Sequence, residues 1–380
     1  MFLTRDSQNI KGLARHELFH FVQYQYMNDR FAGDYWMNWW MEATAEWGEH
    51  TAAELAGESG IDSDYYSSLD AFLAESSERY DEGDTVISGG GPEYGAFIVA
   101  EFLEERLLRD SIRQSWERLV GDAPPLPGAV IKELIEQRRV DGNFADEIQR
   151  FREWAYTIDK NTSGVGFQDS DATRWKQSLD DADFPGHRPR HDTVTIDETG
   201  PGAAGTVEGT TEIQQTGAHY IEIKNPKKFD TDVTVTFDAD SPAVRGSIVL
   251  LDEDGLPTNK CGDSKPLSGS PAVTLTVTCP GAFITMVNAE YGGKWATWSD
   301  VTYQVTYQVT GLVLSNGFVD LGMSAFGHLG IASGVGARLL DRPDTEWIAR
   351  FKVMDGESTR QLGPITLLSV TTPAAVRTFR

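Results

Sequence analysis

Two histidines stand four residues apart near the start of the chain, at His16 and His20, and a glutamate, Glu17, directly follows the first. The surrounding segment predicts a helix from Ser7 to about Met27, because apolar residues recur there at helical spacing and no proline interrupts them. Residues four apart share one face of a helix, so both imidazoles can point at one ion. This H-E-x-x-H arrangement predicts that the two histidines bind zinc and that the glutamate activates a water as general base.

A catalytic zinc ion takes three protein ligands and keeps one position open, so a third ligand is needed. The H-E-x-x-H-x-x-G-x-x-H pattern would supply a third histidine, but Gln23 and Tyr26 occupy the positions where it requires glycine and histidine. The other solution is a glutamate on a second helix, reached after a reversal of the chain. Glu42 is the first candidate, because Gly and Asp residues precede it as a turn requires; Glu46 and Glu49 are the alternatives.

HELFH followed by MEATAEW resembles the pattern of the gluzincin group of zinc metallopeptidases, the thermolysin-like enzymes, in which H-E-x-x-H precedes a glutamate at the head of E-A-x-x-[D/E]. The resemblance implies His16, His20 and Glu42 as zinc ligands and Glu17 as general base. It also implies that Glu46 orients a ligand histidine by accepting its other N–H.

The wider segments HELFHFVQY, WWMEATAEW and YGAFIVAEFLEER are similar to secreted bacterial and archaeal zincins that carry β-sandwich modules after the peptidase, and this likeness covers about residues 7–155. Peptide hydrolysis also needs a group that stabilises the oxyanion, a role usually filled by tyrosine or histidine. Tyr94, at the start of the third predicted helix, is the leading candidate, followed by Tyr35, Tyr24 and His187.

The elements that must position these residues divide the chain into parts. Helical periodicity predicts further helices at about 39–55, 96–120, 129–139 and 143–158. From about residue 192 the period becomes two, which predicts an antiparallel β-sandwich of about seven strands. We therefore expect an α+β multidomain chain: a mainly helical zincin-like catalytic domain at 1–160, a linker or covering loop at 161–190, a β-sandwich at 191–311 and a small β-rich module at 312–380. In that last module the runs GFVDLG, WIARFKVM and PITLLSVTT predict strands.

Composition narrows the classes of partner. The formal net charge of −25 argues against nucleic acid, because phosphate binding needs a basic surface. No stretch approaches the roughly 20 apolar residues of a membrane helix, and MFLTRDSQNIKGL lacks the apolar core of a signal peptide. Cys261 and Cys279 form a disulfide if the compartment is oxidising; two free thiols are the alternative.

Two features of the strand-rich part could bind something else. LDEDG, at 251–255, could hold Ca²⁺ through Asp252 and Asp254, although a hairpin turn is the favoured interpretation. Exposed Trp295 and Trp298 could bind a polysaccharide, although tryptophans three apart more often pack into a core.

Three hypotheses follow for function. The first is a secreted or cell-surface zinc endopeptidase that acts on protein or peptide substrates and carries β modules for attachment or substrate capture. The second is a zinc hydrolase of another substrate class. The third is a non-catalytic cell-surface or binding protein in which the metal site is a relic.

Overall fold

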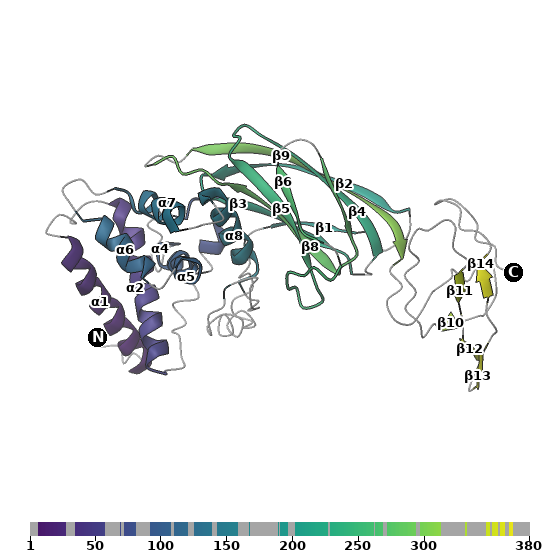
Figure 1. Cartoon of the computed structure of the whole chain (residues 1–380), viewed down its shortest axis with the longest axis horizontal. Coiled ribbons are helices and arrows are strands. Elements are labelled where there is room, and N and C mark those ends of the chain that lie inside the picture. Colours follow the sequence, from purple (N-terminus) through teal and green to yellow (C-terminus); the bar gives the residue numbers. More distant parts are fainter. Residues whose placement is uncertain are drawn as a thin grey trace, which may run out of the picture.

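The protein is described by a computed structural model with helices in the first part of the chain and sheets in the second, an α+β architecture (Figure 1). The structure describes residues 7–27, 35–57, 69, 72–80, 92–107, 110–120, 125–138, 143–158, 167, 189, 191–196, 202–226, 229–261, 263–268, 272–293, 297–312, 331–332, 347–349, 352–355, 358–361 and 365–367.

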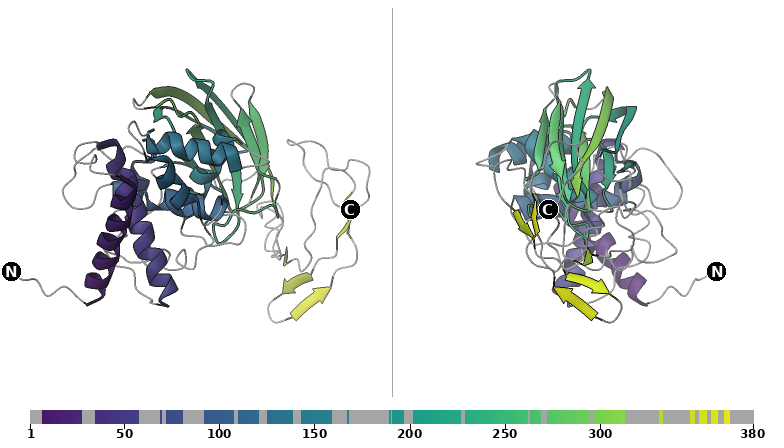
Figure 2. Two further views of the ribbon diagram at one scale, coloured as in Figure 1. Left: turned by 60° about the vertical axis from the view of Figure 1, so that its left-hand side comes forward. Right: turned by 90° about the vertical axis from the view of Figure 1, so that its right-hand side faces the viewer.

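The helices form one end of the molecule, where α1 and α2 lie side by side (Figures 1 and 2). Their bounds are α1 Ser7–Met27, α2 Tyr35–Leu55, α4 Pro92–Gly95, α5 Phe97–Arg106, α6 Ser111–Arg118, α7 Pro127–Arg138 and α8 Phe144–Tyr156. The first helix has the predicted bounds, whereas the second begins four residues before the predicted Trp39. The single helix expected at 96–120 is two helices, because α5 ends with Leu107 as its C-cap and α6 begins anew with Asp110 as its N-cap.

Two larger sheets follow the helices. The five-stranded sheet has the order β1-β3-β8-β5-β6 and the four-stranded sheet the order β2-β9-β4-β7. Their bounds are β1 His191–Thr195, β2 Ala204–Gln214, β3 Ala218–Lys224, β4 Phe229–Ala239, β5 Val244–Leu251, β6 Lys265–Ser268, β7 Val273–Val277, β8 Gly281–Asn288 and β9 Trp298–Leu312. Among the described strands of these two sheets, β1 pairs with β3 in parallel and the other pairings are antiparallel, which corrects the expectation of purely antiparallel strands.

Short strands near the C-terminus make two smaller sheets. They are β10 Ile331–Ala332, β11 Trp347–Ala349, β12 Lys352–Asp355, β13 Ser358–Gln361 and β14 Ile365–Leu367, in the orders β10-β12-β13 and β11-β14. The runs WIARFKVM and PITLLSVTT thus contain strands as predicted, whereas the predicted strand GFVDLG lies outside the described residues.

The five-stranded sheet is covered on both faces. One face shares a hydrophobic cluster with the four-stranded sheet, through residues such as Ile221, Ile248 and Val305. The other face joins the core of the helices, to which it contributes Tyr220 and Phe283. This explains why β5 and β8 are buried almost throughout, whereas burial alternates along β9, which has one exposed face.

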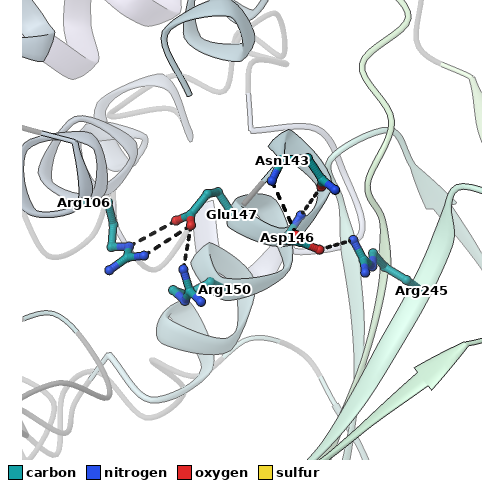
Figure 3. A network of polar contacts seen from close by, with 6 residues as sticks. All are labelled: Arg106, Asn143, Asp146, Glu147, Arg150 and Arg245. Atoms are coloured by element: carbon teal, nitrogen blue, oxygen red, sulfur yellow. Dashed lines mark hydrogen bonds and ion pairs between the residues drawn. The ribbon is translucent and has the colours of Figure 1, made fainter. Parts of the chain in front are cut away.

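Helix α8 attaches the helical part to the sheets (Figure 3). Asn143 caps the helix and Asp146 completes the capping box. The Asp146 carboxylate also binds Arg245 on β5, at 2.7 Å. Buried Glu147 binds Arg106 on α5 at 3.1 Å and Arg150 at 2.6 Å. One turn of α8 therefore ties a neighbouring helix and a strand together.

Two local predictions in the strand-rich part are settled. Cys261 and Cys279 are joined in a disulfide, with their Cα atoms 5.6 Å apart. LDEDG forms a turn, because Asp252 Oδ1 accepts hydrogen bonds from the backbone N–H groups of Asp254 and Leu256, and Gly255 adopts a φ of 73°. The hairpin-turn interpretation is therefore confirmed.

Candidate metal centre

The centre lies between α1 and α2, which approach closely because each has a glycine at the contact. A methyl group on Gly12 of α1 would collide with the Glu49 carboxylate, and one on Gly48 of α2 would collide with the Phe19 ring. This close approach lets side chains on the facing surfaces of α1 and α2 meet.

Three of the predicted ligands converge on one point. Glu42 Oε2 lies 3.1 Å from His16 Nε2 and 3.4 Å from His20 Nε2. His16 is 6% exposed, and the side chains of His20 and Glu42 are 12% and 22% exposed. Glu42 is distant from the histidines in the sequence, but the packing of α2 against α1 brings the Glu42 carboxylate close to the Nε2 atoms of both rings. We call these Nε2 atoms the inner nitrogens and the Nδ1 atoms the outer nitrogens.

This geometry fits a zinc ion. Ligand atoms at 2.0–2.1 Å from a tetrahedral zinc ion are about 3.3–3.4 Å from one another. The two distances to Glu42 Oε2, 3.1 and 3.4 Å, are close to that tetrahedral edge. The donor set of two imidazoles and one carboxylate is also that of a catalytic zinc ion with one position open. The residues present therefore fit the metal that the sequence predicts.

Each histidine has a separate partner on its outer nitrogen. His16 Nδ1 lies 3.1 Å from Glu46 Oε1. His20 Nδ1 lies 2.7 Å from Gln23 Oε1. A hydrogen bond to the outer nitrogen fixes the ring orientation and leaves the inner nitrogen for a metal. The structure thus places Glu46 where the family resemblance implies, and it adds Gln23 as a second such partner.

The electrostatics of the cluster follow from its packing. Burial alone would lower the pKa of His16, but hydrogen bonds to Glu42 and Glu46 raise it to about 10. The pKa of His20 is also raised, against burial, by hydrogen bonds to Glu42 and Gln23. Burial would raise the pKa of Glu42, yet the two histidines lower it to about 2. A metal that binds here therefore competes with protons on the imidazoles.

Tyr94, the leading oxyanion candidate, lies on the short helix α4 beside the cluster. Its ring stacks on the His16 ring, with centroids 6.0 Å apart and planes at 25°. Burial and the negative charges of Glu42, Glu93 and Glu46 raise the pKa of Tyr94 to about 12. The phenol is therefore protonated at neutral pH, and its O–H donates a hydrogen bond to the Glu42 carboxylate, which also raises the pKa.

Of the other oxyanion candidates, only Tyr24 has a side chain among those that the structure describes. Tyr24 is 55% exposed on α1. The side chain of Tyr35 and the whole of His187 lie outside the described residues. Of the two candidates with described side chains, Tyr94 is the one whose ring stacks on a histidine of the cluster.

Glu17 is exposed on α1 and lies about 100° around the helix from His16. Large apolar side chains surround it on the same face: Ile10, Leu13, Phe21 and Tyr24 stand at positions −7, −4, +4 and +7 from Glu17 and are 46–64% exposed. We call these four residues the apolar stripe. Six of the nine exposed large hydrophobic side chains in the described part of the chain belong to α1, so exposed apolar surface is concentrated on this helix.

The alternative ligands form a second group. His16, Glu46 and Glu49 also place ligand atoms within 4.8 Å of one another. This group shares His16 with the first, and Glu46 contacts the outer nitrogen of His16. It offers one imidazole rather than two, so it fits zinc less well than the first group. Next to it, His50 is a core residue, 3% exposed, with Nδ1 3.1 Å from Glu101 Oε1.

Sequence reasoning missed Gln23, which attracted notice only as a departure from the three-histidine pattern. The signal was available in its spacing: position 23 is three residues after His20 and shares its face of the helix. Its amide contacts Met41 and Thr44 on α2, and those contacts depend on how the two helices pack. No pattern within α1 alone predicts them.

Of the predicted polysaccharide-binding pair, Trp298 is 45% exposed on β9 and Trp295 lies outside the described residues. None of the helices in the described ranges combines the length and apolarity that a membrane crossing needs.

Comparison with known proteins yields little. No protein-family model matches the chain, and none of the curated proteins matches it. Among solved structures, the periplasmic inhibitor of g-type lysozyme from Aeromonas hydrophila is 13% identical, covers 31% of this chain and 96% of its own, and has a TM-score of 0.21. The corresponding Salmonella Typhimurium inhibitor is 10% identical over 30% of this chain and 99% of its own, with a TM-score of 0.19.

A Bacillus endospore appendage protein, described as forming disulfide-linked pili, is 13% identical over 30% of this chain and 98% of its own, with a TM-score of 0.18. Likenesses at these TM-scores carry no argument about the fold or the function of this chain.

Proposed function

We propose that the protein is a zinc-dependent peptidase whose metal is held by His16, His20 and Glu42. The observation that carries the proposal is the position of one carboxylate oxygen, Glu42 Oε2, at 3.1 and 3.4 Å from two imidazole nitrogens. Outer partners on both histidines support it, because a site built for metal needs oriented ligands.

A zinc ion bound there would supply Lewis acidity for the attack of water on a peptide carbonyl. Glu17 accepts the proton of the attacking water and returns it to the leaving amine. Its exposed position beside the histidine pair leaves it accessible to a water and a substrate. Tyr94 donates its O–H to the oxyanion, a role that suits a phenol whose pKa is raised to about 12.

The apolar stripe is where the substrate chain docks. It flanks Glu17 on both sides along the helix and spans, from Ile10 to Tyr24, about 21 Å at 1.5 Å per residue. An extended peptide covers that length with about six residues. Apolar substrate side chains on both sides of the scissile bond would bury the exposed parts of Phe21 and Leu13.

In this proposal the helices form the catalytic domain and the two larger sheets form an appended β-sandwich. The Cys261–Cys279 disulfide supports a secreted or cell-surface location, because disulfides persist in oxidising compartments. Exposed Trp298 gives the sandwich one aromatic side chain with which to contact a polysaccharide or cell surface.

The test is Glu17→Gln, assayed with a library of internally quenched peptides and compared with Glu136→Gln. Glu136 is an exposed glutamate on α7 that serves as a matched control. We expect Glu17→Gln to lower the rate of cleavage by roughly 10²–10⁴-fold while one zinc ion stays bound, and Glu136→Gln to retain the wild-type rate.

A Glu17→Gln protein as active as wild type would contradict the mechanism. Bound zinc without peptide cleavage by the wild type would favour a hydrolase of another substrate class. Absence of tightly bound zinc would favour a non-catalytic binding protein.

A further inference from the structure

His20 must be in one particular tautomer to bind a metal through Nε2. A neutral imidazole has one N–H and one lone pair, so its proton must sit on Nδ1 for Nε2 to be free. His20 Nδ1 faces Gln23 Oε1 at 2.7 Å. The tautomer of His20 therefore depends on which end of the Gln23 amide points toward the ring.

The amide of Gln23 can point only one way. Its Nε2 lies 2.9 Å from the backbone oxygen of Met41, and a carbonyl oxygen can only accept a hydrogen bond. The NH₂ group must therefore face α2. The same NH₂ group donates to Thr44 Oγ1 at 2.8 Å. Both hydrogens of the amide are thus used, and its oxygen is left for His20.

Thr44 is fixed in turn. Its hydroxyl donates to the backbone oxygen of Trp40 at 2.7 Å and accepts from the indole N–H of Trp116 at 3.2 Å. An indole nitrogen can only donate, so Thr44 Oγ1 must act as an acceptor toward both Trp116 and Gln23. Gln23 is 1% exposed and Thr44 is fully buried, so water does not offer alternative partners.

We propose that Gln23 is a positioning residue that sets the Nδ1–H tautomer of His20, and that Thr44 and the Met41 carbonyl hold the Gln23 amide in the orientation this requires. The inference rests on the proposed zinc site for its purpose. A chain of hydrogen bonds from α6 through α2 to α1 thereby aims the second zinc ligand. The requirement explains why a glutamine is buried at a helix position where an apolar residue would cost less.

The test compares Gln23→Glu with Gln23→Met in the full chain. Both variants lose the two N–H donors, so both should lower the unfolding temperature of the metal-free protein. Glutamate keeps an oxygen for His20 Nδ1, whereas methionine does not. We expect zinc affinity, measured by chelator competition, to fall by roughly 10–100-fold in Gln23→Met and to stay near the wild-type value in Gln23→Glu.

The matched control is Gln25→Met, the same substitution at an exposed position of the same helix. It should change neither the unfolding temperature nor the zinc affinity. If Gln23 were merely structural, affinity would follow stability and both position-23 variants would lose it equally. That result, or a Gln23→Met protein with wild-type affinity, would overturn the proposal.

A second measurement needs no variant and no metal. Two-bond ¹H–¹⁵N NMR of the wild-type metal-free protein, at an alkaline pH where His20 is neutral, reports its tautomer directly. We expect the proton on Nδ1; a proton on Nε2 would overturn the proposal. Failure of the wild type to bind zinc would refute the proposed function and leave this measurement as the test of Gln23.

Discussion

Among the histidine–carboxylate pairs of the described residues, those between α1 and α2 and those in the five-stranded sheet differ in kind. Between α1 and α2, two imidazoles share one carboxylate oxygen. In the five-stranded sheet, His219 contacts Asp192 at 3.2 Å and His191 contacts Glu222 at 3.3 Å, so that each histidine faces a different carboxylate between β1 and β3. The residue types are the same, but only the first region brings several ligand atoms to one point.

The surroundings of the pairs differ as well. The outer nitrogens of the helical histidines have side-chain partners of their own, Glu46 and Gln23. In the sheet, the carboxylate that contacts His219 has a second partner, because Asp192 also accepts a hydrogen bond from the Tyr303 hydroxyl. The sheet pairs therefore fasten the parallel edge strand β1, whereas the helical cluster has the form of a binding site. The convergence of ligand atoms, more than the residue type, distinguishes the two regions, because His191 in the sheet also has a partner on its second ring nitrogen, the backbone oxygen of Pro189 at 2.9 Å.

The largest expected effect comes from removing one histidine from each region. If roughly 12 kcal/mol of zinc binding is shared by three ligands, His20→Ala should lose about 4 kcal/mol, close to a thousandfold in zinc affinity. His219→Ala should leave zinc affinity unchanged. Chelator competition on both variants measures the difference, and equal losses of affinity would remove the distinction between the regions.

The disulfide provides the next contrast, because it stabilises only the sheet region. Cys261 and Cys279 are 18 positions apart, and closing a loop of this length contributes roughly 3 kcal/mol to the free energy of unfolding. The double variant Cys261→Ser/Cys279→Ser should unfold at a lower denaturant concentration yet bind zinc as wild type does. A loss of zinc affinity in that variant would show that the sheets help to form the metal site.

The apolar stripe predicts a smaller effect on catalysis. Phe21→Ser removes a side chain that is 64% exposed beside Glu17, whereas Leu18→Ser removes one that is 63% exposed on another side of α1. Loss of about 1 kcal/mol of apolar contact with substrate should lower kcat/KM for a Leu- and Phe-rich peptide roughly fivefold in Phe21→Ser. Leu18→Ser should retain the wild-type value; equal effects would indicate that the stripe does not contact substrate.

In the metal-free protein, the contributions of the two regions to stability should depend on pH in opposite directions. The pKa of His16 is raised from 6.5 to about 10, so its contribution to stability is complete below pH 6.5 and is lost as pH rises through about 10. Burial outweighs Asp192 and lowers the pKa of His219, so its contribution is present above pH 6.5 and is lost as pH falls through the lowered pKa.

Histidine ring signals followed by NMR across the pH range measure both pKa values. The account predicts that His16 titrates above 6.5 and His219 below it. The opposite order would contradict the electrostatic difference between the regions.

Much of the helical site could be predicted from the sequence. The spacing of His16 and His20 defines one face of one helix, and the bounds of α1 follow from local periodicity. The place of Glu42 required a long-range contact, which the family resemblance implied and the Gly12 and Gly48 contacts make possible. Gln23 could not be assigned, because its partners on α2 are set by tertiary packing.

The sheets show where local patterns are insufficient. Strand β2 was not predicted, because Gly205 and Gly209 interrupt its pattern. In the structure these glycines lie opposite Tyr307 and Tyr303 on β9, whose rings occupy the space that side chains on β2 would fill. The parallel pairing of β1 with β3 likewise depends on a connection that no short-range signal specifies.

The central claim is that His16, His20 and Glu42 surround one zinc ion. The most direct measurement is a crystal structure of the zinc-loaded protein with anomalous diffraction data collected on both sides of the zinc edge. The account predicts one strong anomalous peak about 2.0–2.2 Å from His16 Nε2, His20 Nε2 and a Glu42 carboxylate oxygen. A peak located instead at Glu46 and Glu49, or fully loaded crystals without a peak between α1 and α2, would contradict it.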